Sequence, residues 1–160
     1  MKFLAIGVVL LLIVGGAWFS YTNLNEQSIE ENKIETTVVN KQEGIQVTKT
    51  NVAENGGSRL PKGFPADIPV EMATVVDSYK SFYEKVATTQ YAVSYTSKKT
   101  RDELWSIYDK YMKDSGYTIQ TQTSSKSLGQ ISGMKGDDSL SAIISSQKGI
   151  SLVQISYLDR

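Results

Sequence analysis

Residues 100–116 read TRDELWSIYDKYMKDSG, and this stretch decides the kind of fold to expect. It begins with Thr100 and has Glu103 three residues later, which is the pattern of a capping box at a helix N-terminus. Gly116 is a typical residue for the C-terminal end of such a helix, because glycine adopts the left-handed conformation without strain. Between them, apolar residues recur at the spacing of one helical face: Leu104, Ile107, Tyr108, Tyr111 and Met112. The pattern predicts one amphipathic helix.

On both sides of this helix the sequence alternates as strands do. Two such runs precede it, at residues 74–83 and 88–95, and four follow it, at residues 117–123, 128–135, 139–146 and 150–158. The runs are rich in β-branched and aromatic residues, and the last turns contain the Gly and Asp that tight hairpins prefer. We therefore predict an α+β fold, β-β-α-β-β-β-β, with a mostly antiparallel sheet and one helix on one face.

Ahead of the first strand, residues 60–70 read LPKGFPADIPV and hold all three prolines of the chain. Prolines at this density prevent both a helix and ladder pairing, so the segment should run extended. Leu60, Phe64 and Ile68 recur at one spacing, which predicts a strap with an apolar side against the domain. A proline-rich ligand for a partner is the alternative, but the prolines are spaced more widely than in polyproline recognition motifs.

Together, this segment, two strands, a capped helix ending in Asp114-Ser115-Gly116-Tyr117 and a strand meander resemble a group of uncharacterised exported bacterial proteins. Members of that group carry an L-P-x-G-F-P-x-D-[IV]-P segment before a small α+β domain. The resemblance covers residues 60–158 and implies this fold and export from the cytoplasm. It implies no activity and no site residues. Members often place a Pro-Gly or Gly-Ala pair soon after the third proline, where this chain has residues 70–73, VEMA.

The N-terminal residues 3–19 are apolar and uncharged, a length at the short end of what spans a bilayer as a helix. Trp18, Phe19 and Tyr21 lie at the C-terminal end of this run, where an interfacial aromatic belt belongs. Residues 1–21 are therefore predicted to be a transmembrane anchor in the plasma membrane. The cation Lys2 comes before the apolar run and acidic residues come after it. The positive-inside rule then places the N-terminus in the cytoplasm and the rest of the chain outside.

A cleaved signal peptide is the alternative for the same residues. Lys2 gives a minimal positive region, and Gly15, Gly16 and Ala17 offer small residues before a cut. Cleavage near Ala17 would release a secreted protein. The aromatic cluster that follows fits an anchor better.

Residues 22–59 read as a polar, flexible stalk. They are rich in Asn, Glu, Gln, Thr and Lys, with too few aliphatic residues to bury a core. Within them the pattern allows a short helix near residues 26–35, or extended pieces at residues 36–39 and 45–48. A stalk of this length holds the domain, residues 60–160, at a distance from the bilayer.

Composition excludes several chemistries. The chain has 17 Lys and Arg against 17 Asp and Glu, so it lacks the field of a nucleic-acid binder. It has no cysteine and no histidine, which removes Ser-His-Asp and Cys-His catalysis and zinc sites built on these residues. Asp137 and Asp138 suit a turn better than a calcium loop. We predict no catalytic residues, no metal and no cofactor, and the sequence favours a non-enzymatic role.

Six residues are candidates for a contact surface: Trp105, Tyr79, Tyr91, Lys98, Lys99 and Arg101. Trp105 lies off the main helical face, and the three cations form the single basic cluster of the domain. Tyr79, Tyr83, Tyr91 and Tyr95 would form an aromatic ladder if they lined one face of the first hairpin. Packing of these tyrosines beneath the helix is favoured over an exposed ladder.

The predicted function is that of a membrane-anchored extracytoplasmic domain that binds a protein or polymer of the cell envelope. A small hydrolase with two catalytic carboxylates is the first alternative, and it requires two acids roughly 5–10 Å apart in a cleft. A pilin-like subunit is the second. The sequence argues against it, because the apolar run contains no glutamate and the Gly56-Gly57 pair interrupts any long helix.

Overall fold

The computed structural model describes residues 30–32, 35–40, 44–50, 60–125 and 127–160. The predicted anchor lies outside these residues, and no helix among those described is long and apolar enough to cross a membrane. In chain order the elements are β1 (Glu30–Asn32), β2 (Glu35–Asn40), β3 (Ile45–Thr50), the 3-10 helix η1 (Met72–Thr74), β4 (Val75–Tyr83), the 3-10 helix η2 (Glu84–Val86), β5 (Thr88–Ser97), α2 (Arg101–Asp114), β6 (Thr118–Ser124), β7 (Leu128–Lys135), β8 (Asp138–Gln147) and β9 (Ile150–Asp159).

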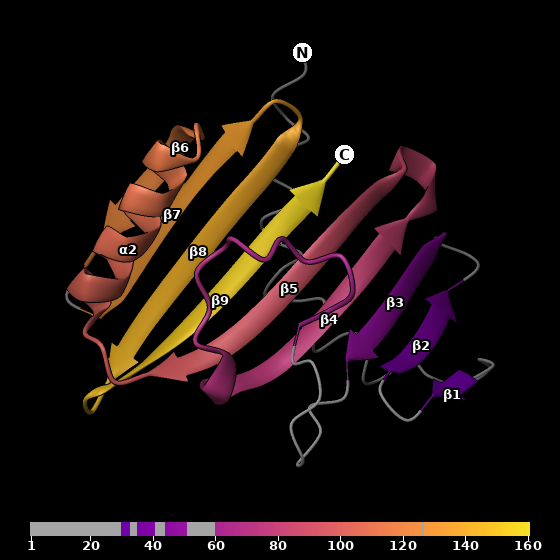
Figure 1. The fold of residues 1–160 in the computed structure, drawn as a ribbon, viewed down its shortest axis with the longest axis horizontal. Helices are drawn as coiled ribbons and strands as arrows, with labels where there is room; N and C mark the ends of the chain where they lie inside the picture. Colours follow the sequence, from indigo (N-terminus) through magenta and orange to yellow (C-terminus); the bar gives the residue numbers. More distant parts are fainter. Residues whose placement is uncertain (1–29, 33–34, 41–43, 51–59, 126) are drawn as a thin grey trace.

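All of these strands join one sheet in the order β1-β2-β3-β4-β5-β9-β8-β7-β6, and each neighbouring pair is antiparallel. α2 packs on one face of this sheet, over β6, β7 and β8 (Figure 1). The predicted α+β fold, an antiparallel sheet with one helix on one face, is confirmed for the described residues. The six strands predicted around the helix correspond to β4 through β9.

Beyond β4 the sheet continues into part of the segment for which the sequence predicted a polar stalk. β3 pairs with β4, with Ile45 opposite Tyr83 and Thr48 opposite Lys80, and β2 and β1 follow outward. An unpaired strand edge offers backbone donors and acceptors, and β2 and β3 supply the β-branched residues that suit pairing with it. Of the two alternatives considered for the segment, the extended pieces form, and β1 takes the place of a helix at residues 30–32.

The helix α2 begins and ends as the sequence predicted. The Thr100 hydroxyl accepts a hydrogen bond from the Glu103 N–H at 3.3 Å, and the Glu103 carboxylate accepts one from the Thr100 N–H at 2.8 Å. Gly116 has a φ of +81°, and the Tyr117 N–H donates to the Met112 carbonyl at 2.8 Å. Three residues of the predicted apolar face are fully buried against the sheet: Leu104, Tyr108 and Met112.

The strap, residues 60–70, crosses the same face of the sheet as α2 (Figure 1). Its apolar side is confirmed, because Phe64 and Ile68 are buried in the core cluster. The extended course is wrong, since the strap makes two turns. The Phe64 N–H donates to the Pro61 carbonyl at 3.0 Å, and the Ile68 N–H donates to the Pro65 carbonyl at 3.4 Å. Proline removes a donor but keeps its carbonyl, so Pro61 and Pro65 each accept the bond that closes a turn.

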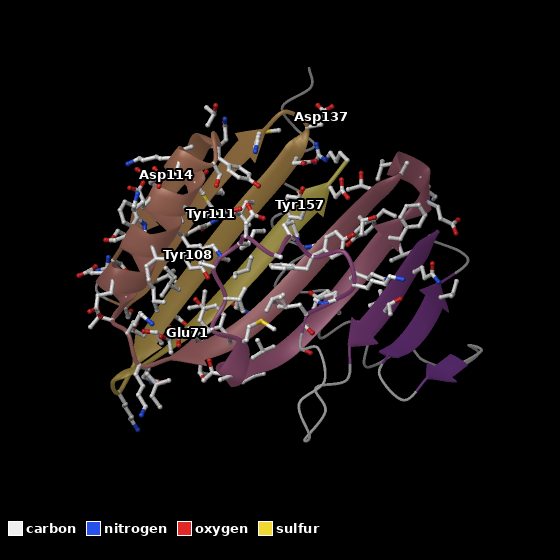
Figure 2. The ribbon with its side chains drawn as sticks, in the orientation of Figure 1. Glu71, Tyr108, Tyr111, Asp114, Asp137 and Tyr157 are labelled. Atoms are coloured by element: carbon white, nitrogen blue, oxygen red, sulfur yellow. The ribbon has the colours of Figure 1, made fainter. Side chains whose placement is uncertain are left out.

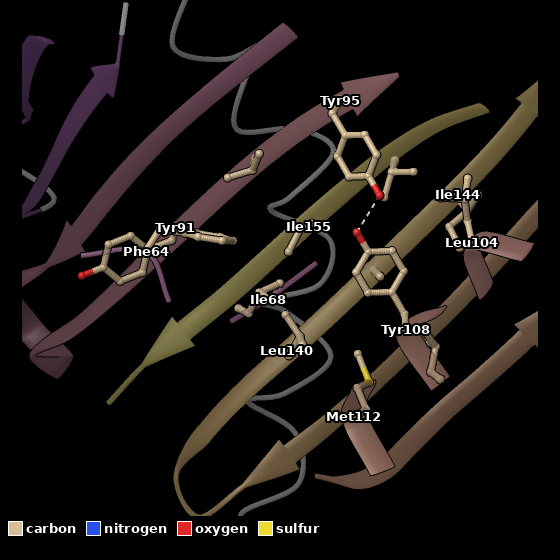
Figure 3. Packing of buried hydrophobic residues seen from close by; sticks show 14 of the residues in the cluster. Phe64, Ile68, Tyr91, Tyr95, Leu104, Tyr108, Met112, Leu140, Ile144 and Ile155 are labelled. Carbon is tan, nitrogen blue, oxygen red and sulfur yellow. Dashed lines mark hydrogen bonds between the residues drawn. The ribbon is translucent and has the colours of Figure 1, made fainter. Parts of the chain in front are cut away.

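The hydrophobic core lies between this face of the sheet and the layer formed by α2 and the strap (Figure 3). It is built from alternate residues of adjacent strands, such as Ile131 opposite Ala142 and Ala142 opposite Ile155. Two tyrosines, Tyr95 from β5 and Tyr108 from α2, meet at its centre with their hydroxyls 2.8 Å apart.

Candidate functional site

The three aromatic residues predicted for a contact surface lie in different places. Tyr91 is buried in the core and stacks on Tyr157, with ring centroids 6.1 Å apart. Tyr79 is opposite Ala92 and therefore lies on the other face of the sheet. Trp105 is half-buried and packs against the core, with its Nε1 buried and unpaired among the described residues. These side chains do not form one surface.

The register of the first hairpin also rules out a four-tyrosine ladder. Tyr91 is opposite Lys80, whereas Tyr79 and Tyr83 are opposite Ala92 and Thr88. Because paired residues share a face and neighbours alternate, Tyr79 and Tyr83 lie on the face opposite to Tyr91 and Tyr95. Both Tyr91 and Tyr95 belong to the core cluster. Tyr95 packs beneath the helix, where it meets Tyr108, whereas Tyr91 packs beneath the strap, against Phe64.

The basic cluster stays together at the junction of β5 and α2, but two of its members are engaged. Lys99 Nζ lies 2.6 Å from Glu71 Oε1, and Arg101 Nη1 lies 2.7 Å from Asp102 Oδ1. Lys98 is exposed and forms no ion pair within the described residues. Of the three predicted cations, Lys98 is the one left free to meet a partner.

Lys98 belongs to what we call the basal end, the end of the sheet at which β5 and β8 finish and β4, β7 and β9 begin. It is the lower end in Figure 1. The register brings these termini together, with Ser97 opposite Ser151 and Leu128 opposite Ser145. The Ser151 hydroxyl also donates to the Lys99 carbonyl at 2.8 Å, which ties the β5–α2 loop to the start of β9. Six side chains define the basal end: Met72, Val76, Lys98, Leu128, Lys148 and Ile150.

Exposed apolar side chains gather at the basal end. Of the six large apolar residues that are exposed in the described chain, four lie here: Met72 at 43%, Val76 at 55%, Leu128 at 43% and Ile150 at 57%. The other two, Phe82 and Val86, lie at the opposite end of the sheet. Single exposed apolar residues are ordinary, but a group gathered from four elements at one end is a candidate contact surface.

Two carboxylates of the basal end, Glu71 and Glu103, accept hydrogen bonds from neighbouring groups. Glu71 accepts hydrogen bonds from Lys99 Nζ at 2.6 Å and from the Ser97 hydroxyl at 2.8 Å. The bond from Lys99 is the main reason that the pKa of Glu71 is lowered from its ordinary value. The pKa of Glu103 is also lowered, chiefly by the Thr100 N–H in the capping box. Lys98 and Lys148, by contrast, are exposed and form no ion pair with any described residue.

A second group of tyrosines and aspartates joins α2 to the strap and β9 to β8, and Tyr111 and Tyr157 mark it in Figure 2. Tyr111 donates to Asp67 Oδ2 and Tyr157 donates to Asp138 Oδ2, each at 2.8 Å. Burial, together with these bonds to carboxylates, raises the pKa of both tyrosines. Each acid is thus used as an acceptor that fastens one element to another.

Metal ligation finds no support in the described residues, where no three His, Cys, Asp or Glu side chains are placed to share an ion. The turn that contains Asp137 starts with Gly136 at a φ of +62°. Asp138 accepts from Tyr157 and from the backbone N–H of Arg160 at 3.2 Å. Both aspartates therefore act in the turn and its closure, as the sequence interpretation favoured.

Sequence reasoning named Lys98 but missed the rest of the basal end. A local signal existed for the β8–β9 hairpin, because Lys148-Gly149 reads as a two-residue turn with Ile150 directly after it. Lys148 and Gly149 indeed have φ values of +52° and +79°. No local signal could place Met72 or Leu128 at the same end of the sheet as that hairpin, because they belong to other elements, η1 and β7.

We compared the chain with protein-family models, curated proteins and solved structures. No protein-family model, curated protein or solved structure matches the chain.

Proposed function

We propose that this protein is a single-pass, membrane-anchored binding module whose domain lies outside the cytoplasm and contacts a component of the cell envelope. Residues 1–21 would serve as the anchor, and the basal end would be the contact surface. The role is non-enzymatic. The resemblance to exported bacterial proteins is part of the motivation and concerns only export and fold.

The observation that carries the proposal is the composition of the basal end. Apolar side chains from η1, β4, β7 and β9 are exposed at this end, which also holds Lys98 and Lys148, two exposed cations that pair with no acid in the described part of the chain. Exposed apolar side chains cost solubility, so a group of them at one end is typical of a surface that is covered during function.

The two alternatives have less support. For a carboxylate hydrolase, the acids Glu71, Asp67 and Asp138 each accept a hydrogen bond from a neighbouring side chain. These bonds fasten the strap and the strands rather than leaving an acid free for proton transfer. For a pilin-like subunit, the apolar run without glutamate remains the argument against it.

Protease shaving of intact cells, followed by N-terminal sequencing of the membrane-retained fragment, tests the anchor and its orientation. External protease should remove the domain and leave a fragment that begins at Met1 in the membrane fraction. A chain that is protected until the cells are lysed would contradict the proposed orientation. A soluble mature chain beginning just after Ala17 would contradict anchoring and support the secreted alternative.

Site-specific photo-crosslinking in cells tests the contact surface. A photoreactive residue in place of Leu128, exposed at 43%, should give adducts. The same residue in place of Phe82, exposed at 37% at the other end of the sheet, is the matched control and should give far fewer. Equal yields at the two positions would remove the basal end as the contact surface.

A further inference from the structure

We infer that the basal end rests on the surface of an anionic lipid bilayer, the same membrane in which the N-terminal segment is anchored. This inference rests on the proposed function and names the partner of its contact surface. Three features carry it: the exposed apolar side chains of the basal end, the two exposed lysines that form no ion pair with a described residue, and the length of chain between anchor and sheet.

The apolar side chains of the basal end sit on turns and strand termini, where they can enter a headgroup layer without unfolding a strand. Ile150 is the first residue of β9 and follows the turn Lys148-Gly149 directly. Leu128 is the first residue of β7, and Val76 sits at the bulge between Val75 and Asp77. Such positions suit shallow insertion at the boundary between headgroups and acyl chains.

Two exposed lysines at this end can meet anionic headgroups, while the Glu103 carboxylate is turned back onto Thr100 in the capping box. Lys98 and Lys148 are exposed without a described carboxylate partner, whereas Glu71 is engaged by Lys99 and Asp102 by Arg101. Lysines beside exposed apolar residues are the combination that anionic lipid surfaces attract. A neutral protein groove would favour the apolar side chains but would gain nothing from the lysines, which is why lipid is the better match.

The strands β1 to β3 bring the domain close to the membrane. The sequence predicted a stalk over residues 22–59, but β1 begins at Glu30, so residues 22–29 separate the predicted anchor from the sheet. A chain extends by at most about 3.3–3.6 Å per residue, so this tether reaches about 30 Å or less. That reach is too short to hold the domain far from the bilayer and allows one end of the sheet to meet it.

The absence of cysteine makes a direct test available, because one introduced cysteine is a unique labelling site. The full chain with Ile150→Cys would carry an environment-sensitive fluorophore and be reconstituted into vesicles of phosphatidylcholine, alone or with phosphatidylglycerol. The matched control is Val86→Cys, an aliphatic residue exposed at 69% at the opposite end of the sheet.

With phosphatidylglycerol present, the Ile150→Cys probe should shift to the blue and be quenched several-fold more by brominated lipid than the Val86→Cys probe. High salt should reduce the difference, because it screens the attraction of lysines to anionic lipid. Adding Lys98→Glu and Lys148→Glu should abolish it, while Lys85→Glu at the opposite end should leave it unchanged. Circular dichroism of each variant would show that the fold is retained.

Equal signals from the two probes in anionic vesicles would overturn the inference and leave the anchor intact, with a protein or polymer partner as the remaining occupant. Failure of the unlabelled chain to float with any vesicle would overturn the anchor and the inference together. The two failures are therefore distinguishable in one preparation.

Discussion

Tyr108 shows how a polar group is accommodated in this core. Its side chain is fully buried, and its hydroxyl donates to the Pro69 carbonyl at 2.7 Å. Because that bond uses its one proton, the Tyr95 hydroxyl must be the donor in the 2.8 Å contact between the two tyrosines. Burial raises the pKa of Tyr108 far above the ordinary range, so the hydroxyl stays protonated. One side chain thus fastens α2 to both the strap and β5.

Replacing Tyr108→Phe should lower the free energy of unfolding by about 1–3 kcal/mol, because it leaves the Pro69 carbonyl without its donor and the Tyr95 hydroxyl without its acceptor. Tyr95→Phe is the matched control. It removes one bond but leaves the bond from Tyr108 to Pro69 in place, so its cost should be smaller. Urea denaturation followed by fluorescence measures both. Equal costs would contradict the direction assigned to the two bonds.

At the scale of elements, what the sequence predicted depended on how local the deciding interactions were. The capping box, the apolar face and Gly116 all lie within α2 or next to it, so its bounds could be read directly. β2 and β3 could not be placed, because a polar strand is decided by whether an edge such as that of β4 is available to it. The strap was expected to be extended because proline has no N–H to donate, but it turns because the Pro61 and Pro65 carbonyls still accept hydrogen bonds.

The strap is held by a close approach at Gly63, which has a φ of +95°. A Cβ built there would lie 2.7 Å from the Tyr91 hydroxyl, closer than side chains tolerate. Gly63→Ala should therefore cost more than the roughly 1–2 kcal/mol expected for alanine in a left-handed conformation. Gly116→Ala separates the two effects, since its φ is +81° and nothing lies within 4 Å of its Cβ. Thermal or urea unfolding of both variants would test this order, and equal costs would mean that the strap does not press on Tyr91.

At the scale of the whole molecule, the basal end is a tertiary feature. Met72 lies in η1 just before β4, Leu128 is the first residue of β7, and Ile150 is the first residue of β9, so segments far apart in the chain meet at one end of the sheet. The strands themselves were predictable from composition and turns, and Lys98 was recognised as part of a basic cluster. Which lysines remain free was not predictable, because Lys99 meets Glu71 only once the chain around η1 lies beside the β5–α2 loop.

Alkaline pH should unfold the whole domain cooperatively, because its tyrosines are distributed through every layer. Burial raises the pKa of Tyr95, Tyr108, Tyr111 and Tyr157 above the ordinary value of 10.0. Above that pH the unfolded chain loses these protons while the folded chain keeps them. The folded state then binds more protons, so the free energy of unfolding is fully retained below about pH 10 and falls as the pH rises beyond it.

The measurement is the urea midpoint across this range, together with the ultraviolet absorbance of tyrosinate. Absorbance from the buried tyrosines should appear only as the fold is lost. The free energy of unfolding should fall with pH more steeply than the release of a single proton on unfolding would give. Tyr111→Phe removes one of the groups that release a proton on unfolding, so its decline should be shallower than that of the unmodified chain. If instead all tyrosines ionised near their ordinary pKa with the fold intact, they would be exposed to solvent. The strap and α2 would then not cover them, which would contradict the packing described for the core.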